Sequence, residues 1–119
     1  MAMRHIRLEL ARTPDHPAGS IKCGYELNLP LTSEGGFDMA AWPDRQAECT
    51  VRRFWEGEDD EMGELIQVEN GWALSYDPDT DDDDEPLFKL ENHSFKEGEY
   101  LSITEHDGVQ RTFRVVYVR

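Results

Sequence analysis

Short segments in which apolar and polar residues alternate constrain the fold of this chain most strongly. Residues 5–12 and 24–31 place isoleucine, leucine or tyrosine at every second position. Successive side chains of a β-strand point to opposite faces, so this period of two predicts strands that bury one face. Pro30 suggests an edge or the end of the second strand.

Several more segments of this kind follow, separated by residues that favour turns. The predicted strands are residues 5–12, 24–31, 50–55, 65–68, 72–76, 87–90, 100–104 and 111–118. Asn70-Gly71 and Asp107-Gly108 predict the turns of two hairpins. Short strands about ten residues apart predict an antiparallel sandwich or small barrel of about seven to eight strands.

One segment is typical of a helix rather than a strand. We expect a short or kinked helix over about Met39–Glu48, with Asp38 as its N-cap and Pro43 inside the pattern. Trp42 would anchor this helix to the core. The chain is therefore expected to be mainly β, with one short helix, in a single domain spanning residues 1–119.

The charge of the chain is concentrated in one stretch. The sequence has 26 Asp and Glu residues, 12 Lys and Arg residues and a formal net charge of −14. Residues 56–85 contain 14 of the acids and no Lys or Arg, so the rest of the chain is formally neutral. This balance argues against direct binding to nucleic acid and against docking on anionic lipid.

The acidic stretch flanks the hairpin predicted around Asn70-Gly71. A hairpin brings its two ends together, so we expect the two acidic segments to form one acidic pole at one end of the domain. Residues 77–86 are expected to form a mobile acidic loop, because like charges and two prolines oppose a strand. The expected binding residues of the pole are Glu58, Asp59, Asp60, Glu61, Asp79, Asp81, Asp82, Asp83 and Asp84. We therefore expect a binding module that recognises a basic protein partner.

The same loop suggests an alternative function. Asp77, Asp79 and Asp81 occupy alternate positions, as the first ligands of a calcium loop do. The sixth position is Asp82 instead of Gly, and the twelfth is Phe88 instead of Glu, which excludes an EF-hand. Weak binding of exchangeable divalent cations stays open as the second hypothesis, and no cofactor is expected.

A cluster of Arg and aromatic residues precedes the acidic stretch. Arg52, Arg53 and Trp55 allow two interpretations. Alternate aromatic residues could enter the core while an arginine pairs with the acids, or these residues could anchor an interface, where Trp and Arg are enriched.

The cysteines and histidines show no recognised catalytic or metal motif. Cys23 and Cys49 are expected to be buried free thiols in a reducing cytoplasm, although a single bridge between them stays open. A small enzyme built on Cys49 or His93 is the third hypothesis. No apolar run is long enough to span a bilayer and no signal peptide is recognised, so we expect a cytoplasmic monomer.

Three parts of the chain together carry a resemblance. They are residues 4–12, residues 51–61, and residues 98–103 with 112–116. The chain resembles, over nearly its whole length, a family of small alphaproteobacterial proteins of unknown function. This resemblance implies no activity and no site residues.

Overall fold

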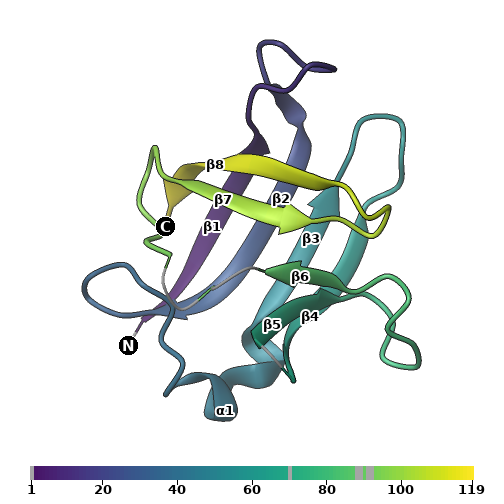
Figure 1. Ribbon diagram of the computed structural model, residues 1–119. Helices are drawn as coiled ribbons and strands as arrows, with labels where there is room; N and C mark the ends of the chain where they lie inside the picture. The colour runs from purple at the N-terminus through teal and green to yellow at the C-terminus, as the bar shows by residue number, and fades with distance from the viewer. Residues whose placement is uncertain (1, 70, 88–89, 91–92) are drawn as a thin grey trace.

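The computed structural model describes residues 2–69, 71–87, 90 and 93–119. These residues form a closed barrel of eight antiparallel strands (Figure 1). The strands are β1 (Ala2–Leu10), β2 (Ser20–Leu31), β3 (Thr50–Phe54), β4 (Glu61–Val68), β5 (Gly71–Ser75), β6 (Glu85–Leu87), β7 (Tyr100–Thr104) and β8 (Gln110–Val118).

Every strand pairs with the next strand in the chain, and the last pairs with the first. On β1, Ile6 lies opposite Leu27 of β2 on one side and Val118 of β8 on the other. The predicted mainly β fold is confirmed, and of the two architectures left open the chain adopts the barrel. Closure pairs the first strand on both sides, so the sheet has no free edge there.

The inward faces of the strands fill the barrel with apolar side chains. The predicted alternation is confirmed in β1 and β2, where Ile6, Leu8 and Leu27 are fully buried. Phe113 on β8 and Ile103 on β7 belong to the same core. In an eight-stranded barrel the interior is about wide enough for side chains to fill.

Two irregularities change the direction of side chains along the strands. Between β1 and β8, Arg7 pairs with Tyr117 but Leu8 pairs with Val115, so Val116 is an extra residue. After this bulge Val118 packs against the core on the same side as Val115. Between β1 and β2, Glu9 pairs with Gly24 but Leu10 pairs with Ser20, which leaves residues 21–23 outside the ladder.

The predicted helix is shorter than expected and begins later. Helix α1 spans Trp42–Arg45, and a 3-10 turn over Gln46–Glu48 follows it. Asp38 accepts the Ala41 N–H and so closes the preceding turn instead of capping the helix. Pro43 lies in the first turn, where its missing N–H has no helical partner to lose. Trp42 does anchor the helix, since its ring meets Trp72 edge-on at 5.0 Å.

The predicted boundaries around the acidic stretch also require correction. Strand β4 begins at Glu61, four residues earlier than expected, and Glu85 already belongs to β6, so the loop before it ends at Asp84 instead of residue 86. The predicted hairpin of β4 and β5 is confirmed, but Gly71 pairs with Val68 inside the ladder. Asn70, and residues 88 and 89 of the predicted strand 87–90, lie outside the described residues.

Candidate functional site

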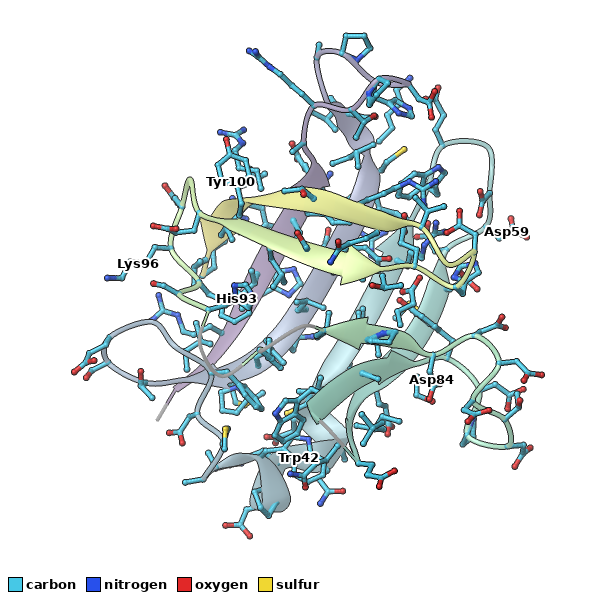
Figure 2. The ribbon with its side chains drawn as sticks, in the orientation of Figure 1. Trp42, Asp59, Asp84, His93, Lys96 and Tyr100 are labelled. Carbon is cyan, nitrogen blue, oxygen red and sulfur yellow. The ribbon has the colours of Figure 1, made fainter. Side chains whose placement is uncertain are left out.

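Four loops meet at one end of the barrel, which we call the loop end. They are residues 11–19, 55–60, 76–84 and 105–109, and they join the strands in consecutive pairs. Because neighbouring strands run in opposite directions, alternate connections must emerge at the same end (Figure 1). Asp59 and Asp84, from the two acidic segments, lie at this end, away from Trp42 (Figure 2). The expectation that both segments share one end is met.

The acids of the β3–β4 loop are largely paired with cations. Asp60 lies 2.7 Å from an Arg52 nitrogen and Glu58 lies 3.3 Å from an Arg53 nitrogen. Glu56 is 3.6 Å from Lys22. Three of the four acids of this loop thus have a cation within 3.6 Å, although Arg52 and Arg53 also pair with other carboxylates. Asp59 has no ion pair within the described residues.

The β5–β6 loop, residues 77–84, is different, and we call it the acidic loop. Two tight turns organise it: the Thr80 N–H donates to the Asp77 carbonyl, and the Asp84 N–H donates to the Asp81 carbonyl. The Asp77 carboxylate accepts the Asp79 N–H at 3.0 Å. Its exposed members Asp77, Asp79, Asp81, Asp82 and Asp83 have no ion pair in the described part of the chain.

The last residue of the acidic loop is less exposed than its neighbours. Burial raises the pKa of the Asp84 carboxyl, and the charges of Asp81 and Asp83 add to this, although a hydrogen bond from Ser75 opposes it. Its Oδ1 is buried and has no hydrogen-bond partner among the described residues. Asp84 therefore belongs to the base of the loop more than to its charged surface.

Beneath the loops lies a buried group of ionisable side chains, which we call the polar cluster. Its members are Tyr25, Arg53, Tyr76, Glu85, Glu105, His106 and Arg111. They come from six strands or strand ends, so the cluster ties the loop end together across the barrel.

Glu85 is at the centre of the polar cluster and is 0% exposed. One of its oxygens accepts the Tyr76 hydroxyl at 2.6 Å and the Tyr25 hydroxyl at 3.0 Å. The other accepts the backbone N–H of His106 at 3.1 Å and lies 2.9 Å from His106 Nδ1. A buried carboxylate needs such partners to offset its lost hydration.

Glu105 is the second buried carboxylate, and two arginines hold it. Arg53 Nε donates to it at 3.1 Å and Arg111 donates at 2.7 Å. The Tyr25 hydroxyl lies 2.7 Å from the same carboxylate and shares its single proton between Glu85 and Glu105. Two guanidinium groups thus face the two buried carboxylates, since Arg53 also lies 3.8 Å from Glu85.

Local electrostatics fix the protonation of the groups around Glu85. Burial raises the pKa of both phenols, Tyr25 and Tyr76, and the charge of Glu85 adds to the rise, so both hydroxyls stay donors. Burial lowers the pKa of His106, but the hydrogen bond and charge of Glu85 outweigh it and leave that pKa raised. Glu61, 3.9 Å from His106 Nε2, acts in the same direction.

The expected interface residues Arg52, Arg53 and Trp55 lie in three different settings. Arg53 is 5% exposed and forms part of the polar cluster, so its guanidinium does not reach the outer surface. Arg52 faces outward and donates to both Glu26 and Asp60. Trp55 is partly buried, with the guanidinium of Arg53 4.5 Å from its ring centre. All three side chains therefore make contacts within the domain, either in its core or in ion pairs.

The aspartates, cysteines and His93 are the residues that the sequence suggests for metal binding or catalysis. No group of three or more His, Cys, Asp or Glu side chains in the described residues is arranged to hold a metal ion. Cys23 and Cys49 are buried free thiols, as predicted. Burial raises the pKa of the Cys49 thiol to about 11, with Glu48 adding to it, so this thiol is protonated at neutral pH. His93 donates its backbone N–H to the Leu90 carbonyl.

The sequence alone did not identify the polar cluster, although part of the signal was present. Alternation puts Arg53 on the same face as Val51, and Tyr25 on the same face as Leu27, and Val51 and Leu27 are buried. Glu85 was counted with the surface acids because it ends a run of aspartates. Glu105 and His106 directly precede the predicted Asp107-Gly108 turn, and nothing local distinguishes them from turn residues.

Comparison of the chain with protein-family models, with curated proteins and with solved structures finds no match. No helix among the described residues is long and apolar enough to cross a bilayer.

Proposed function

We propose that this protein is a binding module that holds a basic segment of a partner protein at its loop end. The observation that carries the proposal is the contrast between the two acidic segments. Three of the four β3–β4 acids have a cation within 3.6 Å, whereas the exposed aspartates of the acidic loop have no cation within ion-pair distance in the described chain. Of the two acidic segments, we therefore assign the binding surface to residues 77–84.

Unpaired carboxylates at one pole suit a cationic partner. Their repulsion is relieved when lysine or arginine side chains approach, and their field speeds the encounter. Because these carboxylates are exposed to solvent, salt screens their attraction for a cationic partner. The screening length is about 10 Å at 0.1 M ionic strength.

The polar cluster supports this role by fixing the base of the loop. Glu85 follows directly after the acidic loop and is held by Tyr25, Tyr76 and His106. A loop whose end is fixed loses less conformational freedom on binding than a free chain. Two buried free thiols fit the reducing cytoplasm, where we place the module, and the closed barrel fits a monomer.

The test is fluorescence anisotropy with a labelled peptide of alternating lysine and serine, titrated at 25 to 300 mM NaCl. The protein is compared with a fourfold variant, D79N/D81N/D82N/D83N. At low salt we expect saturable binding that the variant weakens at least about tenfold, and weaker binding as salt rises. Mg²⁺ added at millimolar concentration tests whether a divalent cation competes for the same loop.

A matched control removes the same charge at the opposite end of the barrel. The variant E34Q/D44N/E69Q/E97Q changes four exposed acids outside the loop end. We expect it to weaken binding by less than about threefold, since only the distant field changes. Equal losses in the two variants would show that net charge, and not the acidic loop, attracts the peptide, and would overturn the proposal.

A further inference from the structure

A second surface feature lies away from the acidic loop. A groove of about 1010 Å³ runs between the outer face of β7 and β8 and the β1–β2 loop. Its floor is a row across three strands, because Arg114 of β8 pairs with Tyr100 of β7 on one side and with Glu9 of β1 on the other. Tyr100 is 57% exposed and is labelled in Figure 2.

One wall of the groove is the bulged part of β2. Residues 21–23 lie outside the β1–β2 ladder, and this leaves Ile21 70% exposed. The bulge is held in place, since Arg7 donates to the Ile21 carbonyl at 3.0 Å. Bulges commonly redirect a side chain next to a functional site. Here the bulge leaves an aliphatic side chain in the lining of the same groove as the exposed Tyr100.

The β1–β2 loop above this wall is also well organised. Thr13 and His16 exchange two backbone hydrogen bonds, of 3.0 and 3.1 Å, and the Gly19 N–H donates to the His16 carbonyl. Gly19 has a φ of +74°, and a Cβ there would lie 2.6 Å from the Leu10 carbonyl oxygen. The groove is therefore bounded by fixed backbone on this side.

The charge in the groove is unusual for so acidic a chain. Arg12 and Arg114 line it, and neither side chain has an ion pair or hydrogen bond within the described residues. The two acids of the lining are already engaged, Glu9 by Arg7 at 2.8 Å and Glu56 by Lys22 at 3.6 Å. In a chain of net charge −14, two unpaired guanidinium groups in one groove indicate an anionic ligand.

A smaller groove makes a useful comparison. It has about 470 Å³ and contains the cations Arg4 and Lys96, but Glu34 and Glu97 also line it. Its charges cancel, so it offers no net attraction for an anion. The larger groove alone of these two combines unpaired cations with exposed apolar side chains.

We propose that the larger groove binds an aromatic organic anion. The guanidinium groups of Arg12 and Arg114 contact its carboxylate or phosphate group, and Tyr100 and Ile21 contact its ring. Arginine matches both kinds of oxyanion in a bidentate manner, and an aromatic ring stacks on tyrosine and on a guanidinium plane. This site is separate from the acidic loop, and its ligand has the opposite charge.

Four probes test the proposal by amide chemical shifts of the ¹⁵N-labelled protein. They are 1-naphthyl phosphate, 1-naphthoate, the neutral 1-naphthalenemethanol and inorganic phosphate. We expect saturable shifts at residues 20–22, 100 and 112–114 with at least one naphthyl anion, and at least about tenfold weaker binding of the neutral probe and of inorganic phosphate. The tighter of the two naphthyl anions identifies the head group.

Variants that each lack one arginine distinguish binding in the groove from nonspecific electrostatic attraction to the protein. Arg114→Gln, and independently Arg12→Gln, should weaken the naphthyl anion at least about fivefold. Arg119→Gln is the matched control, since Arg119 is exposed and lies on the Tyr117 ring, outside the groove. Shifts that do not saturate, equal binding of the neutral probe, or equal losses in Arg114→Gln and Arg119→Gln would each overturn the proposal.

Discussion

At the scale of single residues, the polar cluster shows how position decides the role of a charged side chain. Asp83 and Glu85 are two residues apart, yet the first is exposed and the second is fully buried. The buried carboxylate is stabilised only because Tyr25, Tyr76 and His106 reach it from other elements. Removing one partner of such a buried group costs more than removing an exposed charge.

The pair of His106 and Glu85 leads to a pH prediction. Because the folded pKa of His106 is raised, the stability that the pair contributes is full below the unfolded pKa, about 6.5, and is lost as pH rises through the folded value. The free energy of unfolding of the protein should exceed that of His106→Gln by on the order of 1 kcal/mol at pH 5.5. This difference should shrink by pH 8.5, as followed by urea unfolding.

A second measurement assigns the effect to the carboxylate. Proton NMR titration of the His106 ring should show its pKa falling when Glu85 is replaced by Gln, while Asp83→Asn should leave it nearly unchanged because Asp83 is exposed. If the His106 pKa is the same in Glu85→Gln and in the unaltered protein, the proposed coupling is wrong.

At the scale of elements, the close approach of neighbouring strands depends on particular glycines. Gly24 of β2 is paired with β1 on one side and with β3 on the other. A Cβ at this position would be 2.0 Å from the Leu8 carbonyl oxygen. It would also be 2.9 Å from the Phe54 ring. The backbone of a paired strand cannot move aside easily, so this position requires glycine.

We predict that Gly24→Ala lowers the free energy of unfolding by about 2–3 kcal/mol, because the new methyl group overpacks against backbone. Gly36→Ala is the matched control, since its nearest contacts would be 3.8 Å away and its φ is ordinary. It should change stability by less than about 0.5 kcal/mol. Urea unfolding of both variants measures this, and similar losses in the two would contradict the packing explanation.

At the scale of the whole molecule, the closed barrel brings the two acidic segments to the same end. The loops that carry residues 55–60 and 76–84 emerge at the same end, and only the first has cations within ion-pair distance of its acids. Repulsion among the aspartates of the acidic loop therefore opposes the folded state in the absence of a partner.

Salt should relieve this repulsion. We expect the free energy of unfolding to rise by on the order of 1 kcal/mol between 10 and 300 mM NaCl, and to rise less in D79N/D81N/D82N/D83N. The variant with four neutralised acids at the opposite end should keep most of the rise. If all three proteins show the same salt dependence, the repulsion does not come from the acidic loop and the prediction is wrong.

Much of the fold could be predicted because its causes are local. Alternation in residues 5–12 and 24–31 specifies which face of a strand is buried, and turn residues specify where hairpins form. The acidic pole could be predicted for the same reason, since a hairpin brings its own ends together. The helix begins later than the sequence predicts, because Asp38 accepts the Ala41 N–H and closes a turn before it.

The sequence by itself determined the strands, their buried faces and the stretch that carries the charge. Only the tertiary structure decided that the sheet closes, because closure pairs β1 with β8 from opposite ends of the chain. The tertiary structure also decided which carboxylates are exposed and which are buried. Glu85 and Glu105 are 20 residues apart and become neighbours of one tyrosine, Tyr25, only when the barrel closes around them. The physical reason is that burial and pairing depend on contacts across the barrel, and those are absent from any local pattern.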